Sequence, residues 1–246
     1  MSVVIVAMNY RLGGFGFLPG AEIFGDDASN TGLLDQFLAL KWVTIWGDSA
    51  GAISVFDQMA LYDGEITYNG MPLFRGAIMN TGSIVPANHV DGIKGQAVYH
   101  TVVRNGGCLD AQETRGCLHG LDYARSLNAA NSVPSILDYN SVAESYLPRP
   151  DGMALTESAE QLAMKGKYAS VSYHHRQSLY SFDASRQRIT DLVATYQSID
   201  EDGSLFRTGS MYNWYPQHKR LAAILGDLKF TLTFESLLNY AQKSKA

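Results

Sequence analysis

Hydrophobic and polar positions follow two different patterns over the first eighty residues. An unbroken apolar run rich in β-branched residues at 2–8 predicts a buried strand of a parallel sheet. Further strands are predicted at 43–46 and 74–79, whereas 33–42 and 52–61 place apolar residues at helical spacing. The resulting order of strand, helix, strand, helix and strand is typical of an α/β fold with a parallel sheet.

The predicted helix over 33–42 runs directly into the predicted strand over 43–46. Helix-to-strand connections in such units usually take about 2 to 6 residues, so either the helix ends early or a segment is missing there. Asn30 or Thr31 could cap this helix, because short polar side chains accept the free amide hydrogens of a first turn. Later helices are predicted over 95–105, 158–165, 186–196 and 217–227.

Composition narrows the class of protein. The 246 residues are 46% hydrophobic and only 17% charged, which excludes a disordered chain. The length allows one large domain or two small ones, and because no linker marks a boundary we expect a single domain over residues 1–246. The longest apolar run, 3–8, is far shorter than the roughly 18 residues that span a membrane. The chain begins without a basic n-region, so no signal peptide is expected in it. A net charge of −5 without a basic cluster argues against a nucleic-acid partner.

The candidate chemistry is centred on Ser49. Gly47-Asp48-Ser49-Ala50-Gly51 fits the pattern G-x-S-x-G and lies between a predicted strand and a predicted helix, which is the context of a nucleophile elbow. We expect the turn to be too tight for side chains at both glycine positions. The amide of Ala50 would then donate to a developing oxyanion. The alternative is a glycine-rich turn with a passive serine, and the flanking strand and helix favour the elbow.

Several separated stretches extend this pattern. The chain contains NYR at 9–11 and GFL at 16–18, then NTGLLDQFLALKWV at 30–43 before the GDSAG pentapeptide, and together these resemble type-B carboxylesterases and lipases. SYLPRPDG at 145–152, GKYA at 166–169 and KRLAAILGD at 219–227 resemble the secreted fungal lipases in particular. The resemblance implies an α/β-hydrolase fold, a mostly parallel sheet with flanking helices, and secretion. It also implies an ester or lipid substrate and no cofactor or metal.

The resemblance assigns only part of a catalytic triad. Ser49 matches the nucleophile and Ala50 an oxyanion-hole amide, whereas Asp48 stands where the family usually has glutamate. The triad acid and histidine stay unassigned, because the expected acidic segment after residue 171 is replaced by 172–177 and the histidine would lie beyond residue 246. The family's glycine-rich oxyanion loop would precede the first predicted strand. We therefore expect a partial fold that is incomplete at both ends, like an internally deleted lipase fragment.

Six histidines follow Ser49 and are candidates for the base, since the hydrolase order is Ser, then acid, then His. His174 and His175 occupy the place of the acidic segment. An adjacent pair also suggests a metal site, but no carboxylate or cysteine follows at ligand spacing. Surface or hydrogen-bonded roles are expected for the other four, which are His89, His100, His119 and His218.

The resemblance further implies a structural disulfide between Cys108 and Cys117, with two reduced thiols as the alternative in a cytosolic product. Asp35 is expected to form a hydrogen bond or salt bridge buried beside the elbow.

Because family strands would precede residue 1 and follow residue 246, either 2–8 or 74–79 should approach an uncovered sheet edge. Two functions follow: a serine ester hydrolase of lipase type, or a catalytically inactive fragment of one.

Overall fold

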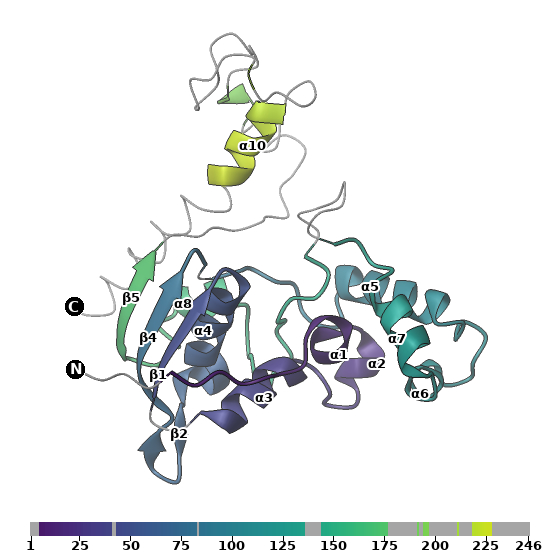
Figure 1. The fold of residues 1–246 in the computed structure, drawn as a ribbon, viewed down its shortest axis with the longest axis horizontal. Coiled ribbons are helices and arrows are strands. Elements are labelled where there is room, and N and C mark those ends of the chain that lie inside the picture. The colour runs from purple at the N-terminus through teal and green to yellow at the C-terminus, as the bar shows by residue number, and fades with distance from the viewer. Residues whose placement is uncertain are drawn as a thin grey trace.

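A parallel three-stranded sheet forms the centre of the computed structural model. The structure describes residues 5–40, 43–82, 84–135, 144–176, 191, 194–196, 211 and 218–227. The strand order is β1 (Val43–Asp48), β4 (Phe74–Asn80) and β5 (Ser172–Arg176), as Figure 1 shows. β4 runs parallel to both neighbours, and its Ala77 is in register with Ile45 on one side and Tyr173 on the other. The predicted α/β class is therefore confirmed.

Helix α4 (Ala50–Ala60) follows β1 directly and packs against both β1 and β4. Two further helices contact α4, namely α3 (Thr31–Ala39) and α8 (Ala159–Met164). These elements share one hydrophobic core, because the apolar face of α4 covers the sheet. The largest fully buried side chains of this core are Leu33, Phe56, Met59, Leu61, Phe74, Met79, Ile84, Leu155 and Leu162.

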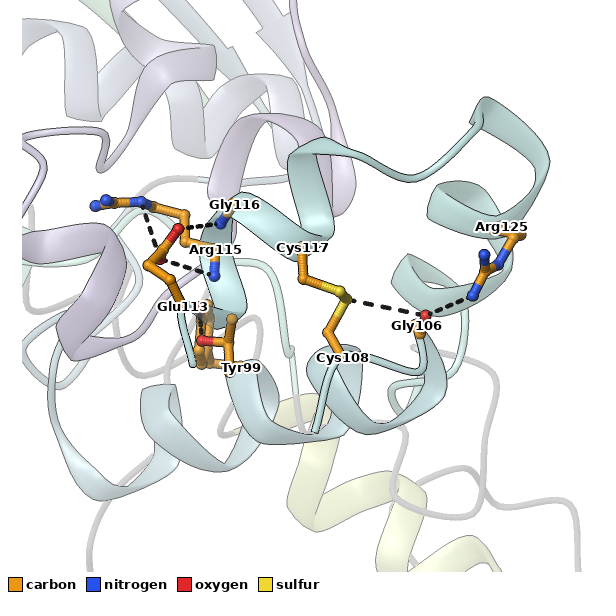
Figure 2. Close-up of a disulfide and its surroundings, with 9 residues drawn as sticks. Tyr99, Gly106, Cys108, Glu113, Arg115, Gly116, Cys117 and Arg125 are labelled. Carbon is orange, nitrogen blue, oxygen red and sulfur yellow. Dashed lines mark hydrogen bonds and ion pairs between the residues drawn. A yellow bond between two sulfur atoms is a disulfide. The ribbon is translucent and has the colours of Figure 1, made fainter. Parts of the chain in front are cut away.

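A second group of helices lies beside the sheet (Figure 1). It comprises α1 (Gly13–Phe17), α2 (Ala21–Phe24), α5 (Ile93–Asn105), α6 (Thr114–His119) and α7 (Tyr123–Ala130). A disulfide between Cys108 and Cys117, with a Cα–Cα separation of 5.7 Å, ties α6 to the chain just after α5 (Figure 2). The implied pairing of the two cysteines is confirmed.

The remaining described elements are small. Leu61–Gly64 forms a 3₁₀ turn, η1, and the strands β2 (Thr67–Tyr68) and β3 (Met71–Pro72) form an antiparallel hairpin. Helix α10 (His218–Gly226) lies near the end of the chain. None of the helices in the described ranges is long and apolar enough to cross a membrane.

Most predicted elements are confirmed, including the early end of the first helix. Helix α3 stops at Ala39, and Leu40 is already extended with φ −80° and ψ 131°. The predicted elements at 43–46, 52–61, 74–79, 95–105, 158–165 and 217–227 correspond to β1, α4, β4, α5, α8 and α10. Most of the helix predicted over 186–196 lies outside the described residues.

Three expectations are wrong. Residues 5–8 form no strand, because no described strand offers them backbone partners. Ile5 and Val6 are each 77% exposed. Residues 2–4 of the predicted strand lie outside the described part. β4 lies at the centre of the described sheet, so β1 and β5 are its edges instead. Asn30 precedes α3 with φ 53° but does not cap it through its side chain, which bonds to Arg149 and Asp151.

Candidate active site

Ser49 lies at a sharp turn between β1 and α4, as predicted. Its backbone has φ 54° and ψ −119°, a conformation that a residue with a Cβ rarely adopts. The residue is exposed at the carboxyl end of β1, immediately before the first turn of α4. Strained backbone of this kind persists only where the surroundings hold it, and such positions cluster at functional sites.

Hydrogen bonds from the end of β4 hold this turn. The Ser49 amide donates to the carbonyl oxygen of Asn80 at 2.8 Å and to the hydroxyl of Thr81 at 3.1 Å. The Thr81 hydroxyl in turn donates to Asp48 Oδ1 at 2.9 Å. Asp48 and Asn80 are partners in the parallel register of β1 and β4, which brings the two strand ends together. Thr81 was not predicted to hold the turn, although it lies two residues after the strand predicted over 74–79.

Two glycines allow the close approach of backbone at the turn, but a third does not need to be glycine. A Cβ on Gly47 would lie 2.1 Å from the Gly51 carbonyl oxygen, and a Cβ on Gly82 would lie 2.3 Å from the Ser49 carbonyl oxygen. A Cβ on Gly51 would meet no atom of the described residues within 4 Å. The expected tight fit at both motif glycines is therefore confirmed at Gly47 and wrong at Gly51.

The first turn of α4 offers amides to a negative charge. The Ser49 carbonyl oxygen accepts the first helical bonds, from Ala52 at 2.9 Å and Ile53 at 3.2 Å. The amides of Ala50 and Gly51 come before these and, like all first-turn amides, have no acceptor within the helix. The positive end of the helix dipole lies at the same place. An oxyanion formed beside Ser49 could therefore be stabilised by the Ala50 amide.

No described histidine side chain hydrogen-bonds to Ser49 Oγ. His89 contacts Asp91 through Nδ1 and Oδ1 at 2.6 Å, and His100 contacts Gln96 at 3.1 Å. With His119, these histidines are exposed, as expected. The backbone of His218 begins α10, and its side chain is outside the described part.

His174 and His175 lie on β5, with their side chains outside the described part. Their backbone positions are in register with Ile78 and Met79 of β4. Met79 is also paired with Gly47, so His175 stands two strands away from the start of the Ser49 turn. Adjacent strands lie about 4.8 Å apart, which separates these backbones by roughly 10 Å.

Asp57 is a buried carboxylic acid on α4, eight positions after Ser49. Its side chain belongs to a residue that is only 2% exposed, and Oδ2 has no hydrogen-bond partner among the described residues. Burial raises the pKa of Asp57 to about 8, because the charged form is poorly solvated there. This burial favours the neutral form of the carboxyl group in the folded protein, and no local sequence pattern indicated Asp57.

Asp35 forms the expected salt bridge, but the side chain is partly exposed rather than buried. It accepts hydrogen bonds from the Arg11 amide at 3.0 Å, Nε at 2.8 Å and Nη2 at 2.7 Å, with 25% of the carboxylate side chain exposed. Hydrogen bonds from the Arg11 side chain and amide lower the pKa of Asp35 to about 2. The pair fixes the segment before α1 onto α3.

In the described part of the chain, no cluster of three His, Cys, Asp or Glu side chains is placed to hold a metal ion. The polar groups at the turn are Ser49, the first amides of α4 and the Asp48–Thr81 pair. This arrangement presents an exposed serine beside amides that have no acceptor within α4, which suits attack on a carbonyl carbon.

Comparisons with known proteins agree with this geometry. The model described as "Carboxylesterase family" matches residues 1–185. Secreted lipase 1 of Botryotinia fuckeliana is 48% identical over 98% of the chain, and a secreted triacylglycerol lipase of Gibberella zeae is 47% identical over 98%. The chain spans 49% and 48% of the lengths of these two relatives. In fold, it is similar to Aspergillus niger EstA, with a TM-score of 0.71 and 22% identity over 96% of this chain and 50% of that one.

Proposed function

Since this chain belongs to the carboxylesterase family, we propose that it carries the nucleophile of a lipase-type carboxylic ester hydrolase, and that Ser49 is that nucleophile. The observation that carries the proposal is the backbone of Ser49, a non-glycine residue held at φ 54° between β1 and α4. The residue is exposed, and the next residue begins a helix whose first amides have no acceptor within the helix. The relatives named as lipases support an ester or lipid substrate.

The proposed reaction uses these groups in sequence. The Ser49 hydroxyl attacks the ester carbonyl carbon while a base takes its proton, and the Ala50 amide donates to the oxygen that becomes negative. Collapse of the tetrahedral intermediate expels the alcohol and leaves the acyl group on Ser49. Water then hydrolyses this acyl ester and restores the hydroxyl. Secretion fits the Cys108–Cys117 disulfide, because disulfides persist in oxidising compartments.

A second candidate function is a catalytically inactive relative of the lipases, which keeps the elbow without turnover. The observation that favours it is that no histidine side chain in the described ranges hydrogen-bonds to Ser49 Oγ. A serine hydroxyl is a weak nucleophile until a base within about 2.6 to 3.2 Å accepts its proton. His174 and His175 are the pair to test as a replacement base, because they lie on the same sheet as the turn.

Hydrolysis of a short p-nitrophenyl ester separates the two functions. The unmodified chain is compared with Ser49→Ala and with Ser54→Ala, which changes a control serine on α4, the helix that Ser49 precedes. Turnover that is lost in Ser49→Ala and kept in Ser54→Ala supports the hydrolase. If turnover is then also lost in His174→Ala or in His175→Ala, that histidine is identified as the base. Equal background rates in all variants would support the inactive relative.

Covalent labelling gives an independent measurement. A fluorophosphonate loses fluoride when an activated serine oxygen bonds to its phosphorus, so the modified residue can be located by mass spectrometry. Labelling at Ser49 without ester turnover would mean that the nucleophile is activated but deacylation fails. Absence of labelling together with absence of turnover would overturn the role of Ser49 in this chain.

A further inference from the structure

We propose that the chain holds a second ligand site, away from Ser49, for an uncharged alkyl- or acyl-chain molecule with a single hydroxyl or carbonyl group. The site is a cavity of about 340 Å³ among α1, α5, α6 and α7. This volume falls within the roughly 300 to 1,000 Å³ range of small-molecule sites. None of Asp48, Ser49, Ala50 and Thr81 lines it, so the site does not depend on the proposed nucleophile.

The walls of the cavity are mainly apolar. Ile23 from α2, Val102 from α5 and Leu118 from α6 line it, together with Leu121 between α6 and α7. On the α1 side, Gly14 and Gly16 line the cavity. A hydrocarbon chain entering this space would exchange water for apolar contact, which is favourable in proportion to the area buried.

The two arginines at the cavity are already matched by carboxylates. Arg11 forms a bidentate pair with Asp35. Arg115 pairs with Asp26, and its Nε lies 3.6 Å from Glu113. The cavity therefore has no excess charge to offer a ligand, and a charged headgroup would be desolvated without compensation. This balance favours an uncharged ligand.

Two polar groups of the lining have no hydrogen bond among the described residues, the Ser126 hydroxyl and the His119 ring. Ser126 lies half-buried on α7, and His119 is the last residue of α6. Each can donate or accept one hydrogen bond. A single hydroxyl or carbonyl on the ligand could pair with either group while its chain occupies the apolar walls.

The wall formed by α6 is held in place before any ligand binds. The Cys108–Cys117 disulfide ties α6 to the end of α5, and the Glu113 carboxylate accepts hydrogen bonds from the Arg115 and Gly116 amides at the start of α6 (Figure 2). A site that is fixed in advance loses less conformational entropy on binding. The cavity therefore has the pre-organisation that a small-molecule site requires.

Binding can be measured on the full chain with the neutral fluorescent probe N-phenyl-1-naphthylamine, displaced by decan-1-ol. Ser126→Trp should fill the cavity and weaken decanol binding about tenfold or more, a loss of about 1.4 kcal/mol or more. Asn128→Trp, on the exposed side of the same helix, and Ser49→Ala should bind as the unmodified chain does. Decanoate and decyltrimethylammonium should bind at least about tenfold more weakly than decanol, because their charges lose water.

Several outcomes would overturn the proposal. They are the absence of saturable probe binding, equal binding by Ser126→Trp and Asn128→Trp, and equal affinity for decanol and its charged analogues. Ala28→Leu provides a second and smaller filling of the same cavity, should Ser126→Trp fail to fold. Probe displacement reports this cavity, and ester turnover reports Ser49. Failure of this site and failure of the proposed ester hydrolase therefore give different results.

Discussion

The hydroxyl of Thr81 accepts a hydrogen bond from the backbone amide of Ser49 at 3.1 Å, so the end of one strand holds the turn that follows its neighbour. The same hydroxyl donates to Asp48 Oδ1 at 2.9 Å. One side chain thus joins both residues that precede α4. Thr81 itself has φ 55°, which is costly for a β-branched residue and indicates that its position is imposed by these contacts.

Replacement of Thr81 by valine should loosen the turn. Valine keeps the shape of threonine but can neither accept from Ser49 nor donate to Asp48. We expect the free energy of unfolding to fall by about 1 to 2 kcal/mol, as measured by urea denaturation. Thr81→Ser restores the hydroxyl and should recover most of the loss. Equal stability of Thr81→Val and the unmodified chain would contradict the role of this hydroxyl.

The two motif glycines should respond differently to alanine. In Gly47→Ala the new Cβ would lie 2.1 Å from the Gly51 carbonyl oxygen, so the turn must shift. In Gly51→Ala the Cβ meets no described atom within 4 Å, and alanine favours the helix by about 0.5 to 1 kcal/mol over glycine. Thermal melts should therefore rank Gly51→Ala at or above the unmodified chain and Gly47→Ala well below it. The reverse order would contradict the turn geometry.

The position of Ser49 could be predicted because its signals are local. A β-branched run, a glycine-flanked serine and a helical pattern follow one another within 19 residues, from Val43 to Leu61. Thr81 and Asp57 were not predicted, because their roles depend on tertiary packing. The register of β1 with β4 brings Thr81 to the turn, and the packing of α4 buries Asp57.

The remaining errors have the same physical origin. An apolar run such as 2–8 becomes a strand only where a neighbour supplies backbone partners, and the described residues supply none to 5–8. Asparagine is a residue type that often caps helices, but the side-chain amide of Asn30 instead donates to the Arg149 carbonyl oxygen at 2.7 Å and to Asp151 Oδ2 at 2.8 Å. These contacts join residues more than 100 positions apart, which local pattern cannot indicate.

The outer edge of β1 should promote self-association. Within the described sheet β1 pairs only with β4, and Val43 and Trp46 are 40% and 63% exposed. Unpaired strand edges accept foreign strands, and a charge on such an edge opposes this. Val43→Lys should therefore shift the chain toward monomer in sedimentation velocity at increasing concentration. Leu38→Lys adds the same charge at an exposed position of α3 and should have less effect. Monomeric behaviour of the unmodified chain would contradict the prediction.

Reduction of the disulfide should destabilise the helices around the cavity. Cys108 and Cys117 are nine residues apart, and closing so short a loop contributes roughly 2.5 to 3 kcal/mol in the chain-entropy model. The double variant Cys108→Ser/Cys117→Ser should show this loss in denaturant titrations without added reductant. Dithiothreitol should lower the stability of the unmodified chain and leave the double variant unchanged. An equal response of both to dithiothreitol would contradict the prediction.

The stability of the chain should depend on pH through Asp57, whose folded-state pKa is raised to about 8 by burial. Below about pH 4 the carboxyl group is protonated in both the folded and the unfolded chain. Between about pH 4 and pH 8 the unfolded chain releases this proton while the folded chain keeps it. The free energy of unfolding should therefore fall as pH rises, by up to about 1.4 kcal/mol per pH unit from this group.

Asp57→Asn tests this contribution, because asparagine has nearly the same shape and cannot ionise. Urea titrations between pH 4 and pH 8 should show a shallower fall in the free energy of unfolding for Asp57→Asn, which should become the more stable protein toward pH 8. Asp110→Asn removes a carboxylate at an exposed position and should leave the slope of the unmodified chain in place. Parallel pH profiles for Asp57→Asn and the unmodified chain would mean that Asp57 is already ionised in the folded state, with a partner for its carboxylate.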